Sequence, residues 1–244
     1  MTIIFPMAGL SSRFTKAGYT KPKYMLDMDG NSVFYHAVNS FKNYFQGSTI
    51  VFIYRNIQNT KEFIENECSV MGIKNYKTVE LDFETEGQAH TVELGLKRAN
   101  ISNDESILIF NIDTFRPNFT LPTELDFKNI DGYLEVFEAE GKQWSFVLPE
   151  NDMSNKVVKT TEKERISSLC SSGLYYFKQT EDFLKVFDEI VKKNDRSKNE
   201  YYIAPMYNYL IREGKDIRYA KITLEDIVFC GTPADYEELF SKVK

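Results

Sequence analysis

Apolar residues occur along the first half of the chain in two alternating patterns. Short runs of consecutive apolar residues, rich in β-branched and aromatic side chains, predict strands that are buried on both faces. Longer segments repeat an apolar residue every three to four positions and predict helices. The predicted strands span residues 3–5, 49–54, 76–81 and 106–111, and the predicted helices span 31–45, 60–71 and 88–99. This alternation is typical of a parallel sheet covered by helices on both faces.

The second half of the chain has a different pattern. Its predicted strands are short, at 132–138, 145–148, 156–160 and 173–177, and its predicted helices lie at about 181–193, 201–213 and 234–243. Such strands favour antiparallel additions at the edge of the main sheet. No linker rich in Pro, Gly or Ser divides the chain. We therefore expect one α/β domain over 1–244 with a Rossmann-like, mainly parallel central sheet, and with halves at about 1–115 and 116–244.

The composition excludes several classes of protein. Of the 244 residues, 42% are hydrophobic and 27% are charged, which is ordinary for a globular protein with a substantial core. The net charge of −6 disfavours a nucleic-acid partner. No apolar run approaches the roughly 18 residues of a membrane span. The first strand begins at the N-terminus without a basic or cleavable leader, so we predict no signal peptide.

Cysteine and histidine are scarce. Cys68, Cys170 and Cys230 are far apart and odd in number, none belongs to a C-x-x-C pair, and only two histidines are present. This spacing disfavours a zinc site of thiolates and imidazoles. We expect a cytoplasmic protein whose cysteines are reduced.

A loop of small and basic residues follows the first strand. The strand ends at Pro6, and Gly9 lets the backbone turn without a Cβ atom. Two serines and four cations come next, before any acidic residue: Ser11, Ser12, Arg13, Lys16, Lys21 and Lys23. Free N–H groups and cations in such a loop suit phosphate, although neither the P-loop nor the dinucleotide fingerprint is present. The alternative is a solvated basic loop without a ligand.

Two further strand ends carry candidate ligand-binding residues. Ligands of parallel sheets bind outside the carboxyl ends of the strands. Gly87 and Gln88 follow the third strand, and the Gln88 amide offers both a donor and an acceptor to a ligand. Asp113 follows the fourth strand and has the hard carboxylate that Mg²⁺ prefers. The alternatives are a glycine turn with a solvated Gln and an Asp that only caps a loop.

The opening motif resembles that of a known family. Pro6-Met7-Ala8-Gly9-x-x-Ser12-Arg13, followed by Lys21-Pro22-Lys23, resembles the signature of the nucleotidyltransferases that join sugar phosphates or related phosphates to nucleoside triphosphates. The resemblance implies that Arg13 and Lys23 are catalytic: Arg13 clamps the β and γ phosphates, and Lys23 bridges toward the α-phosphate and the acceptor. The nucleotide-binding residues that it implies are Met7, Ala8, Gly9, Leu10, Ser11, Ser12, Gly87, Gln88, Ala89 and Asn111.

The second half has weaker matches to the same family. They imply an acceptor site made by Glu162, Lys163, Gly173, Glu200 and Tyr201. Glu164 replaces the proline that the family has after its Glu-Lys step, so this region is expected to be reshaped. Each match, taken singly, also has a purely structural interpretation.

The resemblance implies Mg²⁺ as the cofactor, with Asp113 as its ligand. Gly231-Thr232-Pro233 and Asp235 match the closing segment of the family, but Phe229 stands where many members have a second metal-binding Asp. Two alternatives remain open. Asp113 holds the metal largely through water and phosphates, or another carboxylate such as Asp226 takes part.

The resemblance implies transfer of a nucleoside monophosphate to an acceptor phosphate, with release of pyrophosphate. The chain is most similar to the small cytidylyltransferases of capsular polysaccharide pathways, which implies CTP as donor. Among these it resembles the ones that use L-glutamine phosphate and make CDP-L-glutamine for methyl phosphoramidate decoration. The alternatives are a sugar-1-phosphate cytidylyl-, uridylyl- or guanylyltransferase, a catalytically silent nucleotide-binding regulator and a glycosyltransferase. The oligomeric state stays open, a homodimer included.

Overall fold

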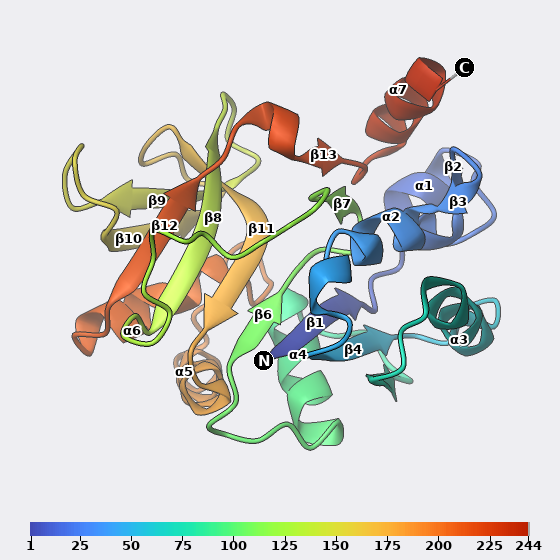
Figure 1. Cartoon of the computed structure of the whole chain (residues 1–244). Helices are drawn as coiled ribbons and strands as arrows, with labels where there is room; N and C mark the ends of the chain where they lie inside the picture. Colours follow the sequence, from blue (N-terminus) through green and yellow to red (C-terminus); the bar gives the residue numbers. More distant parts are fainter. Residues whose placement is uncertain (244) are drawn as a thin grey trace.

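The most apolar runs of the chain form the centre of one nine-stranded sheet (Figure 1). The computed structural model describes residues 1–243. Four strands of the first half lie parallel to one another: β1 (Thr2–Met7), β4 (Thr49–Tyr54), β5 (Tyr76–Glu80) and β6 (Ile107–Ile109). β1 lies between β6 and β4, so the first strand of the sequence is central in the sheet.

The second half adds strands beside β6. They are β8 (Gly132–Glu138), β9 (Ser145–Pro149), β10 (Val157–Glu162), β11 (Leu169–Phe177) and β12 (Ile217–Lys221). β11 is antiparallel to β6, to β8 and to β9, and β10 is antiparallel to β9. β12 is parallel to β8. The predicted fold class, a mainly parallel sheet with added antiparallel strands, is confirmed.

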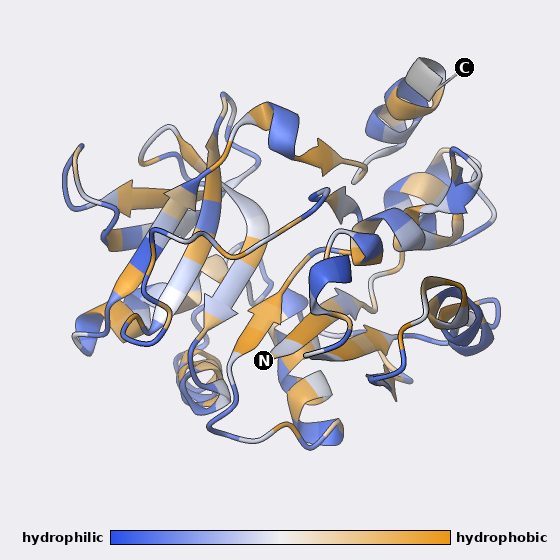
Figure 2. Ribbon diagram, in the orientation of Figure 1, coloured by the Kyte–Doolittle hydropathy of each residue, from blue (hydrophilic) through white to orange (hydrophobic). Residues whose placement is uncertain are grey.

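Helices cover both faces of the sheet. Successive residues of β1 point to opposite faces, so each face contributes apolar side chains to one of the two core clusters. Ile3 and Phe5 pack with α2 (Val33–Asn39) and α3 (Thr60–Met71). Ile4 packs in a second core cluster with three helices, namely α4 (Gln88–Arg98), α5 (Thr180–Lys193) and α6 (Tyr207–Arg212). The central strands are accordingly the most hydrophobic part of the ribbon in Figure 2. None of the described helices is long and apolar enough to cross a membrane.

Short elements complete the fold. The helices are α1 (Ser12–Lys16) and α7 (Pro233–Val243), with single 3-10 turns η1 (Lys23–Met25), η2 (Lys42–Tyr44), η3 (Ala204–Met206) and η4 (Leu224–Asp226). Two small antiparallel pairs join β2 (Asp27–Met28) to β3 (Asn31–Ser32) and β7 (Thr114–Phe115) to β13 (Val228–Phe229). The β7–β13 pair brings the end of the chain beside the residues that follow Asp113.

Two predicted helices are shorter in the structure. The helix expected at 31–45 begins at Val33, because the Ser32 side chain caps it by accepting from the Tyr35 amide, and it gives way to η2 after Asn39. The helix expected at 201–213 begins only at Tyr207. Residues 201–203 are not helical: the backbone of Tyr201 donates to Glu86 O at 2.8 Å and accepts from the amide of Ala89 at 3.0 Å.

The core hydrogen bonds of Tyr207 give a test of the packing between α6 and the sheet. Its hydroxyl is buried and donates to the carbonyls of Tyr176 (2.8 Å) and Tyr133 (3.2 Å). We expect Tyr207→Phe to lower the free energy of unfolding by about 0.5–1.5 kcal/mol, because it removes a buried hydrogen bond. Urea denaturation measures this. Tyr219→Phe is the control, since the Tyr219 hydroxyl is only partly buried and reaches Ser154 O at 3.3 Å. Equal losses in the two variants would contradict this account.

Candidate active site

A cleft of about 760 Å³ opens at the carboxyl ends of β1 and β6. A smaller cavity of about 220 Å³ adjoins it and shares four of its lining residues, Ser11, Lys23, Asn111 and Asp113. The cleft is lined by both halves of the chain. Most of the residues predicted from the sequence as site residues lie along it, and the remainder lie elsewhere for reasons that their local structure explains.

The opening loop folds around Ser11. Ser11 takes a left-handed backbone conformation (φ 52°) at the start of α1, and its hydroxyl accepts from the Lys23 amide at 3.3 Å. The two ends of the loop are thereby held together. Ser11, Ser12, Arg13 and Lys23 line the cleft. Arg13 is exposed and takes part in none of the ion pairs of the described side chains, so its guanidinium is available to an anion.

The remaining predicted residues of this loop differ in position. Met7 and Gly9 line the smaller cavity. Ala8 is buried in the core, and the side chain of Leu10 is 45% exposed; neither lines the two cavities. Ala8 and Leu10 therefore offer a ligand only their backbone.

Asp113 and Lys23 form an ion pair at the junction of the two cavities. The backbone carbonyl of Asp113 accepts from the Cys230 amide at 2.8 Å, and a Cβ atom on Gly231 would lie 3.3 Å from the Asp113 carboxylate. Burial, followed by the negative charge of Asp113, raises the pKa of Cys230 to about 12. The thiol is therefore protonated at neutral pH in the ligand-free protein.

The donor set at Asp113 fits a magnesium ion that keeps most of its water. Within the described residues no group of three or more His, Cys, Asp or Glu side chains could hold a metal. The Asp235 carboxylate also lines the cleft, but it already accepts from the Thr232 amide (2.9 Å) and hydroxyl (2.7 Å). A single carboxylate suffices for Mg²⁺ because the ion retains several waters and takes phosphate oxygens as further ligands.

Asp226 is not brought to this cleft. Its carboxylate caps η4 by accepting from the Thr223 amide (2.9 Å) and hydroxyl (2.8 Å). These bonds, ahead of all other causes, hold the pKa of Asp226 below its usual value. The position of Asp226 therefore does not support the expectation that this carboxylate takes part in metal binding. Phe229 lies in β13 opposite Thr114 and lines the cleft.

Gln88 and Asn111 form the neighbouring part of the wall. The Gln88 amide donates to Asn111 Oδ1 at 2.7 Å, and both residues line the cleft. Gly173 faces them with φ 88°, and a Cβ atom there would lie 2.1 Å from Asn111 Nδ2. Only glycine therefore fits at position 173 while Asn111 keeps this place.

Gly87 and Ala89 do not line the cleft, contrary to expectation. A Cβ atom on Gly87 would lie 2.6 Å from the carbonyl oxygen of Tyr201 and 2.7 Å from its amide nitrogen. The close approach that this glycine allows is thus to the chain itself. Ala89 is fully buried in the core.

Glu162, Lys163 and Tyr202 form the far wall. The Lys163 ammonium donates to the Tyr202 hydroxyl at 2.6 Å and lies 3.6 Å from Glu162, and the Ser145 hydroxyl donates to Glu162. Burial raises the pKa of Glu162, although Ser145 and Lys163 oppose this. Burial lowers the pKa of Lys163, but Tyr202, Glu162 and Glu200 outweigh it, so the net pKa is raised. The wall therefore presents a firmly held cation beside a carboxylate.

The structure corrects the predicted roles of Glu200 and Tyr201. Tyr201 is 2% exposed and packs against Phe187, with ring centroids 5.7 Å apart, while Glu200 is exposed outside the cleft. Tyr202, the residue after Tyr201, lines the cleft instead. The physical reason is that the backbone of Tyr201 is bonded to Glu86 and Ala89, so the helix does not begin here and the Tyr201 ring packs into the core.

Sequence reasoning missed several wall residues, and the largest of them is Trp144. This indole, the only tryptophan of the chain, lines the cleft and contacts the ring of Phe229 at 5.0 Å. Phe137 lies behind both rings at 5.1 and 5.2 Å. The lone tryptophan is the signal that could have found it, since the large amphipathic rings of tryptophan are enriched at interfaces.

The chain resembles known proteins at the level of solved structures. No protein-family model and no curated protein matches the chain. Among solved structures, the nucleoside-diphosphate-sugar pyrophosphorylase from Vibrio cholerae RC9 is 46% identical over 98% of this chain and 99% of its own, with a TM-score of 0.93.

Two more distant structures share the fold alone. An apo UDP-glucose pyrophosphorylase is 16% identical over 99% of this chain and 97% of its own, with a TM-score of 0.75. The inositol-1-phosphate CTP transferase from T. maritima is 17% identical over 100% of this chain and 95% of its own, with a TM-score of 0.74. The near-complete match to the Vibrio protein is much stronger. The chain therefore belongs to the nucleoside-diphosphate-sugar pyrophosphorylase family, the nucleotidyltransferases of sugar-phosphate type.

Proposed function

We propose that the chain is a Mg²⁺-dependent cytidylyltransferase that transfers CMP from CTP to L-glutamine phosphate, giving CDP-L-glutamine and pyrophosphate. This product would serve the methyl phosphoramidate decoration of capsular polysaccharide. Membership of the nucleotidyltransferase family supports the reaction type. The use of CTP is supported by the sequence resemblance and by one neighbour of the same fold, which by its name is a CTP transferase.

The observation that carries the choice of acceptor is the pair of opposite charges on the far wall. Glu162 and Lys163 lie 3.6 Å apart and both line the cleft. L-Glutamine phosphate has an ammonium group as well as carboxylate and phosphate anions, so it offers a partner to each. A hexose 1-phosphate has anionic charge only and would leave the Glu162 carboxylate to hydroxyl groups. An acceptor of both signs would therefore engage both side chains with charged groups, although the Glu-Lys step also occurs in the family members that use sugar phosphates.

The proposed reaction needs no protein nucleophile, because the acceptor phosphate is already an anion. Its oxygen forms a bond to the α-phosphorus in line with the bond that breaks, and the electron pair leaves with pyrophosphate. Catalysis is then positioning and charge stabilisation. Arg13 would neutralise the leaving pyrophosphate, while Lys23 would hold the α-phosphate against the acceptor. Asp113 would hold Mg²⁺, which would supply charge neutralisation to the triphosphate when bound.

A second candidate is a sugar-1-phosphate nucleotidyltransferase. The Vibrio cholerae relative, 46% identical, is described as a nucleoside-diphosphate-sugar pyrophosphorylase, which favours a sugar phosphate as acceptor. Both candidates use the same loop and the same Asp113. They differ in what the far wall binds and in which triphosphate pairs with Gln88.

Pyrophosphate release from a matrix of triphosphates and acceptors separates these candidates. We expect the highest kcat/KM for CTP with L-glutamine phosphate, and loss of turnover when EDTA removes Mg²⁺. Turnover of a hexose 1-phosphate with no response to L-glutamine phosphate would contradict the proposed acceptor. No pyrophosphate from any pair would indicate a silent regulator, whereas turnover of a nucleotide sugar without pyrophosphate would indicate a glycosyltransferase.

Lys23→Ala tests the role of the opening loop. We expect kcat/KM to fall roughly 10²-fold or more, by analogy with the removal of other groups that stabilise a transition state. Lys16→Ala is the matched control, because Lys16 lies in the same loop region but outside the cleft. Steady-state pyrophosphate release measures both. A Lys23→Ala enzyme that performs like Lys16→Ala would remove Lys23 from the mechanism.

Glu162→Gln tests the far wall. Removing the charge while keeping the shape should raise KM for L-glutamine phosphate about 10-fold or more, since hydrogen bonds to charged groups contribute about 1.5–3 kcal/mol. KM for CTP should change little. Glu164→Gln, two residues along and exposed outside the cleft, is the control. An unchanged acceptor KM in Glu162→Gln would argue against recognition of an ammonium group at this wall.

A further inference from the structure

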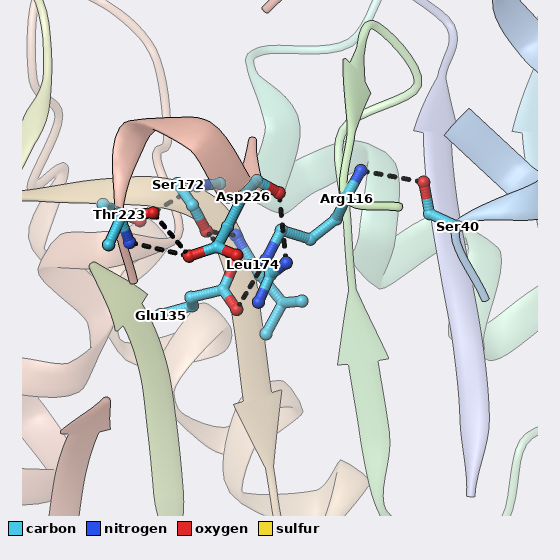
Figure 3. Close-up of polar contacts among 9 residues, drawn as sticks. Ser40, Arg116, Glu135, Ser172, Leu174, Thr223 and Asp226 are labelled. Carbon is cyan, nitrogen blue, oxygen red and sulfur yellow. Dashed lines mark hydrogen bonds and ion pairs between the residues drawn. The ribbon is translucent and has the colours of Figure 1, made fainter. Parts of the chain in front are cut away.

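A buried ion pair lies behind the cleft and takes no part in the reaction described so far (Figure 3). Arg116, three residues after Asp113, donates from Nε to both carboxylate oxygens of Glu135 at 3.0 Å. The Glu135 side chain is 2% exposed and that of Arg116 is 13% exposed. Burial raises the pKa of Glu135, while Arg116 and the hydroxyl of Ser172 oppose the rise.

Arg116 connects segments that are far apart in the sequence. Its backbone amide donates to the Ser40 hydroxyl at the end of α2 (2.8 Å), and its Nη1 donates to the Asp226 carbonyl in η4 (3.1 Å). Figure 3 shows both bonds together with the Glu135 contact. The segment after β7 is thus held between α2, β8 and the turn that precedes β13. Asp113 lies immediately before β7, three residues before Arg116, so the short strand β7 joins it to the anchored arginine.

Glu135 in turn holds a bulge in β11. The Ser172 hydroxyl donates to Glu135 at 3.0 Å and accepts from the Leu174 amide at 3.3 Å. The register between β11 and β8 shifts between Ser171 and Tyr175, which marks the bulge. Gly173 lies in it against Asn111, and residues 171–173 all line the cleft.

The net stability of a buried ion pair does not explain this arrangement. Taking two charges out of water costs about as much as their attraction returns, so a pair of apolar residues of similar size often gives equal or greater stability. What the ion pair adds is a fixed geometry between the elements that it joins. Those elements are the loop with the metal ligand on one side and the β11 bulge on the other.

We propose that Arg116 and Glu135 are positioning residues for nucleotidyl transfer: they fix the Asp113 segment relative to the β11 bulge, so that the triphosphate and the acceptor meet in line. Neither residue lines the cleft. The inference rests on the proposed transfer reaction but not on which triphosphate or acceptor is used. It predicts effects on kcat that are separable from effects on triphosphate binding.

Three variants test this proposal. Glu135→Gln keeps the shape and the acceptor for Ser172 but removes the charge pair. The double variant Arg116→Met/Glu135→Leu replaces the pair by apolar side chains that can pack, which keeps the fold testable if a single variant unfolds. The matched control is Lys215→Met/Asp182→Leu, which removes an ion pair (3.0 Å) between α5 and the turn before β12, away from the cleft.

The readouts are Tm, the triphosphate Kd by calorimetry, kcat by pyrophosphate release, and amide hydrogen exchange over residues 171–174. Glu135→Gln and the double variant should lower kcat about 10- to 100-fold, because small displacements remote from the chemistry have effects of this size. Triphosphate Kd should stay close to wild type, and exchange at 171–174 should accelerate. The control should change Tm only.

If the double variant had both the kcat and the Tm of the wild type, the proposal would be overturned, because the ion pair would then contribute to stability alone. Unchanged exchange at 171–174 in the folded variants would also overturn it. A wild-type enzyme that releases no pyrophosphate with any pair would defeat the proposed function instead. In that case hydrogen exchange still decides whether Glu135 fixes the bulge.

Discussion

The pairing of β6 with its two neighbours is the constraint on which the site depends. β1 lies parallel to β6, so the opening loop and Asp113 leave the sheet at the same edge, where Lys23 meets the Asp113 carboxylate. β11 lies antiparallel to β6, with Tyr175 opposite Ile109, so the residues before Tyr175 reach past the end of β6 and beside Asn111. One strand thereby sets the wall with Lys23 and Asp113 against the wall with Gly173.

This arrangement concentrates charge in a protein that is acidic overall. The net charge is −6, yet Arg13, Lys23 and Lys163 all reach one cleft. Two of these cations are already held by a carboxylate, Lys23 by Asp113 and Lys163 by Glu162. Two phosphate anions repel each other, and cations fixed on opposite walls are the simplest means of bringing them together. Arg13, which is exposed and has no ion-pair partner among the described residues, remains available to an anion.

Much of the fold and part of the site follow from the sequence because they depend on local pattern. Strands and helices have distinct periods, and a loop after a buried strand must lie at a sheet edge, which places Lys23 and Asp113 correctly. The predictions that were wrong concern features that depend on tertiary structure. Whether Tyr201 or Tyr202 faces the cleft depends on where the helix begins, and that depends on backbone bonds to Glu86 and Ala89. Asp226 looks like a free carboxylate until its cap with Thr223 is seen.

The central claim is that the acceptor phosphate itself attacks the α-phosphorus within this cleft. The most direct test uses an acceptor whose phosphate carries a heavy oxygen isotope, with mass spectrometry of both products. The account predicts that all of the label stays in the nucleotide-linked product and that the released pyrophosphate has none. Label in the pyrophosphate, or an unlabelled nucleotide product, would contradict it.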